Sequence, residues 1–481
     1  MATPTSAASG GLDRGTKVAL VAMGLGVFLI ANDFTALSVA IPNIESDLDT
    51  SLTNAQWVIN AYALVFGVLI VTGGRFADLF GRKRIFMIGA ALFAVFSLLS
   101  GLAPNVELLI AGRALMGIGG AMMWPAILGM VYALLPEDKA GLAGGLILGI
   151  AGLGNAVGPM LGGILTDELS WRWVFFLNVP VALFAMWVTQ RKVAESRADT
   201  DVRKVDYWGI ALVSTAVVAV LLALDEGTSA GFGDPPILGL FALSIVAFVM
   251  FFAVERRQGE AALVPSDVLR NRVFAACALT VLLMSAIFFA ALLYLPQFFE
   301  KILGYSALRA GVALLPMMGV FAVMSFVAGH FYDRLGGRIV VSSGAAALAL
   351  GMFMLALLEE DSSYWALVPG MIVLGAGVGL FYSSVTTTAV TALDPSRSSL
   401  AGGIVYMCQI AGGAVGLGLN TAIVASASSL TAGIQVAFAV DGVLALVGLG
   451  IVRIVLPRRE GSHAAPTRFA PHLRHRHRAN A

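Results

Sequence analysis

Three ionisable side chains stand inside long apolar stretches of the sequence: Asp33, Arg113 and Asp441. An ionisable group inside a membrane costs on the order of 3 kcal/mol on insertion scales, so it usually faces a cavity or a partner and marks an ion path. Asp33 and Arg113 fall at similar depths in their apolar stretches, and we expect them to pair. One interpretation is a permanent ion pair that holds helices together. The other is that Asp33 exchanges a proton, because burial favours its protonated form and Arg113 favours its ionised form.

A charged turn, GGRFADLFGRKR, lies between two further apolar stretches, and it recurs as AGHFYDRLGGR. The glycines of such a turn permit close packing and a sharp reversal, and its aspartate can accept hydrogen bonds from a helix amino terminus or a neighbouring arginine. A polar contact of this kind that breaks and re-forms suits a gate. The two copies therefore predict two matched gates, with these residues: Gly74, Asp78, Gly81, Arg82 and Lys83 in the first copy, and Gly329, Asp333, Arg334, Gly336 and Arg338 in the second.

The elements that must position these residues follow from composition. The chain has 481 residues, of which 58% are hydrophobic and 12% charged, and its formal net charge is +1. These values indicate an all-α integral membrane protein, and the near-zero charge argues against a nucleic-acid partner. Cys277 and Cys408 fall in apolar runs and no metal-ligand spacing occurs, so we expect no metal and no other cofactor. Runs of about 20 apolar residues predict about fourteen spans: 17–40, 55–76, 84–103, 106–130, 140–163, 173–190, 207–224, 236–254, 273–297, 308–330, 339–358, 364–390, 399–424 and 434–456.

Arginine and lysine concentrate in alternate connections, which predicts the orientation in the cell membrane. By the positive-inside rule, the connections that carry the charged turns should be cytoplasmic, and so should both termini. The histidine- and arginine-rich end of the chain is interpreted as a solvated basic extension near anionic headgroups. The predicted domains are a cytoplasmic tail (1–16), a first six-helix half (17–195), a linker with two inserted helices (196–260), a second six-helix half (261–456) and the basic tail (457–481).

An internal repeat relates the two halves. GLAGGLILGIAGLGNAVGPMLGG, from Gly141, aligns with SLAGGIVYMCQIAGGAVGLGLN, from Ser399, at an offset of 399 − 141 = 258 residues. The charged turns align at 329 − 74 = 255 residues. Because an offset of eight spans is even, the two halves run parallel. Parallel repeats with a binding site between them are typical of alternating-access transporters.

The fifth predicted span carries small residues at regular spacing, together with an internal proline: Gly154, Gly158, Pro159, Gly162 and Gly163. Glycines four residues apart let helices approach closely, and proline removes a backbone hydrogen bond. One interpretation is simple close packing. The other is a bendable helix that slides at the interface between the halves.

With these motifs in place, the chain resembles the major facilitator superfamily, in the fourteen-span branch of drug:proton antiporters. The resemblance runs from about residue 17 to 456. It rests on G-x-x-x-D-x-x-G-R-K from Gly74, on the arginine with downstream glycines from Arg113, and on the antiporter pattern G-x-x-x-G-P-x-x-G-G from Gly154. The segments Trp171–Pro180 and Leu295–Tyr305 add to it. The loop pattern occurs throughout the superfamily, whereas the antiporter pattern is characteristic of exporters.

This resemblance implies a central cavity lined by the first, fourth, ninth and twelfth spans, proton influx that drives export of a lipophilic small molecule, and Asp33 and Arg113 in coupling. The expected transporter is a monomer in the lipid bilayer. Aromatic residues in those spans would offer stacking surfaces, although they can also be core or lipid-facing: Phe34, Trp124, Phe288, Phe289, Tyr294 and Tyr382. The family pattern does not explain Asp441. It either contacts a cationic substrate or pairs with a neighbouring helix away from the cavity.

Two departures and three rival functions complete the sequence analysis. The family's basic residue after the loop aspartate is Leu79 in the first copy and Arg334 in the second, which predicts unequal gates, and Met116 replaces a common glutamine. A membrane enzyme would need a nucleophile, a metal cluster or an acid and base pair near one surface. A channel would need a filter or charge ring. Uptake by proton symport shares the fold, and the antiporter pattern discriminates against it.

Overall fold

The computed structural model describes residues 13–197, 205–231, 233–259 and 262–457. Within these residues the regular structure is helical, and fourteen helices are long and apolar enough to cross a membrane. The spanning helices are α1 (Arg14–Ala36), α3 (Leu52–Phe80), α4 (Arg82–Gly101), α5 (Val106–Leu134), α6 (Ala140–Glu168), α7 (Arg172–Lys192), α8 (Tyr207–Ala230), α9 (Pro235–Gln258), α11 (Arg272–Lys301), α13 (Leu315–Leu335), α14 (Gly337–Leu355), α15 (Tyr364–Thr391), α16 (Ser398–Ala425) and α17 (Leu430–Val455). The prediction of an all-α membrane protein with about fourteen spans is confirmed.

Short helices lie in the connections: α2 (Ile41–Asp47), η1 (Glu137–Lys139), α10 (Ser266–Arg270), α12 (Ala307–Ala313) and η3 (Pro395–Arg397). We expected the first span to reach residue 40. In the structure α1 ends at Ala36, because a turn and then α2 follow. The expected terminal tails, 1–16 and 457–481, lie almost entirely outside the described residues.

Side chains at the starts of several helices explain where those helices begin. Asp13, Ser51, Asn105 and Ser429 each accept a hydrogen bond from the backbone N–H three residues later. Such caps satisfy donors that the helix leaves unpaired. Between the caps, the apolar runs form helices because a lipid environment offers no partner for free backbone groups.

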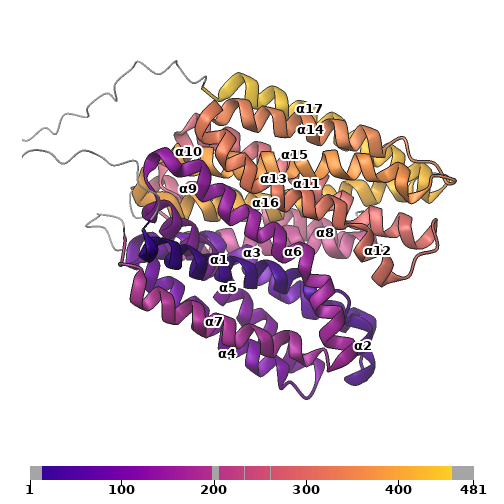
Figure 1. Ribbon diagram of the computed structural model, residues 1–481, viewed down its shortest axis with the longest axis horizontal. Helices are drawn as coiled ribbons and strands as arrows, with labels where there is room; N and C mark the ends of the chain where they lie inside the picture. Colours follow the sequence, from indigo (N-terminus) through magenta and orange to yellow (C-terminus); the bar gives the residue numbers. More distant parts are fainter. Residues whose placement is uncertain (1–12, 198–204, 232, 260–261, 458–481) are drawn as a thin grey trace, which may run out of the picture.

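The spanning helices form two groups of six. In the first, α1 packs against α5, α6 and α7, and α5 packs against α3 and α4; in the second, α11 packs against α15, α16 and α17, and α14 packs against α15 and α17. Figure 1 shows the first group, indigo to magenta, below the orange and yellow second group. The groups meet where α6 packs against α13 and α15, and α16 against α3 and α5. The predicted two-half architecture is confirmed.

The two inserted helices, α8 and α9, pack mainly against each other, and α8 also contacts α3 and α16. Much of α9 is exposed, which fits a helix that faces lipid along most of its length.

One end of the bundle gathers the charged turns. The α3–α4 turn, the start of α6, the α13–α14 turn and the start of α16 meet there through polar contacts. The start of α1 and the end of α17 lie at this same end, at the left of Figure 1. We call it the basic end.

Candidate functional site

The centre of the first half contains a buried ion pair. Asp33 lies one turn before the end of α1, and Arg113 lies in the second turn of α5. Both side chains have zero exposure, and Arg113 Nη1 donates to Asp33 Oδ2. The structure therefore brings together the two residues that the sequence predicted as a pair.

The surroundings of this pair are specific. Asn178 of α7 donates from Nδ2 to Asp33 Oδ1 at 3.2 Å, and also to Ser97 Oγ at 3.2 Å. Arg113 Nε donates to the carbonyl of Val58 at 2.8 Å, and its guanidinium carbon lies 4.3 Å from the Tyr62 ring centroid. Arg113 Nη2 and the Tyr62 hydroxyl are buried without a hydrogen-bond partner within the described residues. The pair thus keeps spare hydrogen-bonding capacity.

The sequence analysis missed Asn178 and Tyr62. Asn178 stands in the motif WRWVFFLNVP, which counted only toward family resemblance, because an uncharged amide gives a weaker signal than an intramembrane acid. Tyr62 stands in an apolar run, where an aromatic residue usually indicates core packing.

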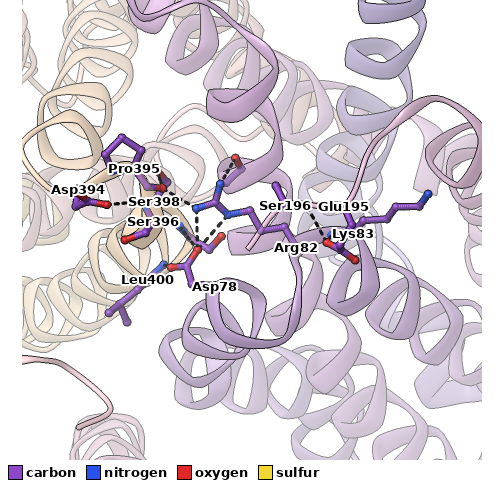
Figure 2. A network of polar contacts seen from close by, with 12 residues as sticks. Asp78, Arg82, Lys83, Glu195, Ser196, Asp394, Pro395, Ser396, Ser398 and Leu400 are labelled. Carbon is purple, nitrogen blue, oxygen red and sulfur yellow. Dashed lines mark hydrogen bonds and ion pairs between the residues drawn. The ribbon is translucent and has the colours of Figure 1, made fainter. Parts of the chain in front are cut away.

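A second polar cluster joins the halves at the basic end (Figure 2). Asp78, near the end of α3, is 1% exposed and accepts hydrogen bonds from Arg82 Nε and Nη2, both at 3.1 Å. It also accepts the backbone N–H groups of Ser399, at 3.3 Å, and Leu400, at 2.8 Å, in the first turn of α16. We call this cluster, Asp78, Arg82 and the first turn of α16, the first latch. A carboxylate here satisfies free N–H groups and complements the helix dipole.

Arg82 extends the first latch in two directions. Its Nη1 donates to the Gly129 carbonyl at 3.2 Å in the first half, and its Nη2 donates to the Pro395 carbonyl at 2.7 Å in the second half. Gly74 allows this approach, because a Cβ there would lie 2.6 Å from the Ser399 carbonyl oxygen. The sequence expected a helix amino terminus or an arginine as the partner of Asp78, and the structure contains both.

The turn after the first latch needs glycine. Gly81 has φ of 113°, a region that side chains other than glycine rarely adopt. Beyond it, Glu195 accepts the N–H groups of Lys83 and Arg84 at 3.0 Å each, and Lys83 Nζ donates to the Gln190 carbonyl at 2.9 Å. These contacts fix the start of α4 to the end of α7 and to the segment after it, and Figure 2 shows Glu195 beside Lys83.

The repeat of the charged turn forms a corresponding second latch between α13 and α6. Asp333 Oδ1 accepts the Gly141 N–H at 2.8 Å, in the first turn of α6. A Cβ on Gly329 would lie 3.2 Å from the Leu142 Cα, so the helix backbones touch. Each latch therefore joins one half to the other.

The two latches are unequal through a residue that the sequence analysis did not single out for this, while the inequality expected from Leu79 and Arg334 stays a prediction. At the shared offset Arg82 corresponds to Gly337, so the second latch has no arginine in that place. Asp333 is only half-buried and Arg334 is exposed. The positive φ of Gly336, 86°, makes the same turn, and Arg338 Nη2 donates to the carbonyl of Arg453 on α17.

The glycines of the antiporter pattern do not lie where the sliding-helix interpretation placed them. A Cβ on Gly154 would lie 3.0 Å from Ala31 Cβ, and one on Gly158 would lie 3.1 Å from the Ala36 nitrogen. Gly162 also packs against Ala36, so all three glycines face α1 within the first half. Close packing is their role in this structure. Other glycines of α6 meet α13 of the second half: Gly141, Gly145, Gly149 and Gly152.

Pro159 and Gly163 face a different neighbour. Together with Gly311 and Val312 of α12 and Leu315 at the start of α13, they line a cavity of about 330 Å³ near the end of the bundle opposite the basic end.

The predicted cavity aromatics fall into two groups. Phe34 packs against Tyr62 and Phe66, and Phe66 and Trp124 both contact Tyr406 of α16, at 5.5 and 4.5 Å between ring centroids. This group crosses from one half to the other. In the second half, Phe288 contacts the rings of Phe289, Phe321 and Tyr382. Tyr294 lies apart from both groups and donates to Thr421 Oγ1 at 3.0 Å.

Asp441 also stands apart from the aromatic groups. It is fully buried on α17 and accepts a hydrogen bond from Asn420 Nδ2 at 3.3 Å. Of the two sequence interpretations, the structure matches the acid that pairs with a neighbouring helix.

Comparisons with known proteins agree with this geometry. The sequence model described as Major Facilitator Superfamily matches residues 23–417 and 317–478. The puromycin resistance protein pur8 of Streptomyces alboniger is 36% identical, over 91% of this chain and 88% of that protein. The multidrug resistance protein Stp of Mycobacterium tuberculosis is 31% identical (87% and 78%), and the tetracenomycin C resistance and export protein of Streptomyces glaucescens is 32% identical (85% and 76%).

A solved structure supports the fold alone. The human organic anion transporter MFSD10 (TETRAN) superposes with a TM-score of 0.64 at 15% identity, covering 91% of this chain and 99% of that one. The protein has two six-helix halves with two inserted helices, a buried acid and arginine pair, and a polar latch at each copy of the charged turn. Together with these relatives, these features lead to one assignment. The chain belongs to the Major Facilitator Superfamily of membrane transporters, in its branch of multidrug and antibiotic exporters.

Proposed function

We propose that this protein exports lipophilic, drug-like molecules across the cell membrane in exchange for protons. The observation that carries the proposal is the buried Asp33–Arg113 pair with its third partner, Asn178. A permanent structural pair would be expected to have its hydrogen bonds completed, since buried polar groups are rarely left unpaired. Among the described residues Arg113 Nη2 has no hydrogen-bond partner, so the arginine has a free donor when Asp33 changes its charge.

Protonation of Asp33 would remove its attraction for Arg113. The freed arginine, which already lies against the Tyr62 ring, could then contact a substrate, so that proton and substrate compete for one site. The second half supports a dedicated role, because the residue that corresponds to Arg113 is Met371. Packing symmetry alone therefore does not require a charge here.

In this proposal the two latches close the basic end, and their opening permits alternating access. Both join the halves at the basic end, which is therefore closed in this conformation. Asp33 takes a proton from outside as substrate leaves, the halves rock, and proton release on the cytoplasmic side permits new substrate to bind. Each proton that enters contributes about 2.3 kcal/mol per 100 mV of membrane potential. We place the basic end and both termini in the cytoplasm, on the positive-inside rule.

The substrate class rests on the relatives and on the aromatic surfaces. The relatives are described as resistance proteins for puromycin and tetracenomycin C, which makes these two compounds the first to test. The group of rings that crosses between the halves, around Trp124 and Tyr406, would stack against flat molecules. We propose a monomer that works in the bilayer without a cofactor.

The test uses purified protein in proteoliposomes with an imposed pH gradient. Wild-type protein should accumulate puromycin against its gradient, and a protonophore should abolish the accumulation. Asp33→Asn should lose accumulation but keep exchange of labelled for unlabelled puromycin, since a neutral side chain still permits rocking. Asp47→Asn, a change to a surface carboxylate on α2, is the matched control and should behave as wild type. Full pH-driven accumulation by Asp33→Asn would contradict the proton role.

A further inference from the structure

Asp441 is a buried acid in the second half that the pair at Asp33 does not involve. It lies in the middle of α17, and its side chain has zero exposure. Its Oδ1 accepts one hydrogen bond, 3.3 Å long, from Asn420 Nδ2 of α16. That same amide nitrogen makes a shorter bond, 2.8 Å, to the carbonyl of Gly416. Asp441 is therefore only weakly held by its one donor.

Two buried oxygen atoms in this contact lack a donor. Asp441 Oδ2 and Asn420 Oδ1 have no hydrogen-bond partner within the described part of the chain. Buried acceptors are normally satisfied, and an ionised carboxylate offers acceptors only. A proton on Asp441 would add the missing donor and remove an uncompensated charge from the membrane interior.

No ion pair to Asp441 is seen among the described residues. The helices packed against α17 are α11, α14 and α16. From α11 the titratable side chain that faces Asp441 is Tyr294, whose hydroxyl donates to Thr421. From α14 the ring of Phe353 packs beside Gly442. From α16 the neighbour is the neutral Asn420. The ion pairs formed by Asp33, Asp47, Asp78 and Asp267 all lie elsewhere. Asp33, which has Arg113 against it, is the opposite case.

We propose that Asp441 is a second proton site of the transport cycle, protonated in this conformation and ionised when the basic end opens. The inference rests on the proposed proton-coupled export, which it extends from one proton to two. Helix α16 provides the connection. Its first turn belongs to the first latch, and its last turns carry Asn420, so the helix links the two ends of the bundle.

Helix α16 presents glycines to α11, so no side chain of α16 interlocks with α11 at these positions. A Cβ on Gly412 would lie 2.7 Å from the Leu282 carbonyl carbon, and Gly416 packs directly on Ala286. When the first latch opens, a shift of α16 would carry Asn420 away from α17 and admit water to Asp441. A carboxyl group in contact with water ionises readily at neutral pH.

The first experiment needs no substrate. Infrared spectra of the purified protein in lipid nanodiscs at pH 7 report the C=O stretch of protonated carboxyl groups, which carboxylates lack. Subtracting the Asp441→Asn spectrum from that of the wild type should leave a protonated-carboxyl band. Asp441→Glu should keep a band at shifted frequency, and Asp33→Asn should keep the wild-type band. If the wild-type and Asp441→Asn spectra superimpose in this region, Asp441 is ionised and the inference is wrong.

The second experiment counts coupled protons. Proteoliposomes are given a pH difference of one unit with the membrane potential clamped at zero. The puromycin gradient at which net flux stops is then measured. Each coupled proton supports about a tenfold substrate gradient per pH unit. Asp441→Asn should therefore hold about a tenfold smaller gradient than the wild type at one pH unit. This balance point does not depend on how much protein is active, so partial misfolding cannot imitate it.

The outcomes separate the two proposals. An unchanged balance point in Asp441→Asn would overturn the second proton site and leave export at Asp33 standing. A wild-type protein with the Asp441 band but without any pH-driven flux would instead overturn the proposed function, while Asp441 would remain a bound-proton site.

Discussion

Replacing Asp78 with asparagine should open the basic end of the transporter. The substitution keeps the size of the side chain but removes the charge that Arg82 and the first turn of α16 share. Arg82 would retain its hydrogen bonds to the carbonyls of Gly129 and Pro395. It would lose its counter-ion, although its side chain is buried, with 4% of its surface exposed. The closed arrangement is therefore the state that this change destabilises.

The size of the effect follows from burial. Removing one partner of a buried pair costs about 3–5 kcal/mol, and we take about 3 because asparagine still accepts a hydrogen bond. This corresponds to a roughly 150-fold shift of the equilibrium. A protein closed in about 99 of 100 molecules would become closed in about 40 of 100. Asp333→Asn is the matched control: it is half-buried and its latch has Gly337 in the place of Arg82, so about 1 kcal/mol is expected.

Spin-label distances across the basic end provide the assay. Lys192, at the end of α7, and Arg453, at the end of α17, are exposed and belong to different halves, so labelled cysteines at these positions report their separation. The native cysteines, Cys277 and Cys408, are first replaced by alanine. Pulsed electron paramagnetic resonance should show a single short distance in the labelled protein with Asp78 intact, and a second, longer distance in the labelled Asp78→Asn variant. The population of the longer distance should be much smaller in Asp333→Asn.

Two results would refute this reasoning. An unchanged distance distribution in Asp78→Asn would show that the first latch does not hold the basic end closed. Equal shifts in Asp78→Asn and Asp333→Asn would show that burial and the Arg82 contact do not set the strength of a latch.

Three further predictions concern packing, pH and substrate range. Gly158→Ala should lower the melting temperature in detergent, because the added methyl group would overpack against α1 at a cost of about 1–3 kcal/mol. Gly319→Ala is the control and should be neutral or slightly stabilising, because no atom lies within 4 Å of the added Cβ. The hydrogen bond from Arg172 lowers the pKa of Asp47, so their contact should stabilise the protein above the ordinary aspartate pKa of about 4. This stabilisation should be lost as pH falls through the lowered pKa of folded Asp47. Melting curves of wild type and Arg172→Ala should differ by less than about 1 kcal/mol at pH 7, since the pair is exposed, and the difference should shrink as the pH is lowered below about 4. Tyr406→Ala should change the relative resistance that cells show to a panel of aromatic drugs while leaving protein abundance unchanged, and an unaltered resistance profile would exclude its ring from the substrate surface.

The sequence was sufficient to predict the spans, the two halves and the central pair. Bilayer thickness sets the length of each span, so apolar run length carries the information, and the pairing of Asp33 with Arg113 followed from equal depth. Asn178 was not predicted, because an amide leaves no charge or hydropathy signal that separates it from a packed polar residue. Its contact with Asp33 depends on how α7 rotates, which a helix without a strong polar face does not specify.

The glycines of α6 show a second limit of the sequence. The helix carries glycines on more than one side, and spacing alone identifies a small face without naming the neighbour that it meets. The structure assigns Gly154, Gly158 and Gly162 to α1, and Gly145 to α13. Which face meets which helix depends on tertiary packing of the whole bundle.

Both latches bind main-chain N–H groups, and this affects how the protein can diverge. The carboxylates of Asp78 and Asp333 accept hydrogen bonds from the N–H groups of Ser399, Leu400 and Gly141. Every amino acid except proline supplies such a group. The first turn of α16 can therefore accept many substitutions that spare the close approach at Gly74, while each aspartate has no equivalent substitute. In a collection of natural variants, we expect the acids to stay fixed, and Gly141 with them, because a Cβ there would lie 2.4 Å from the Gly329 carbonyl oxygen.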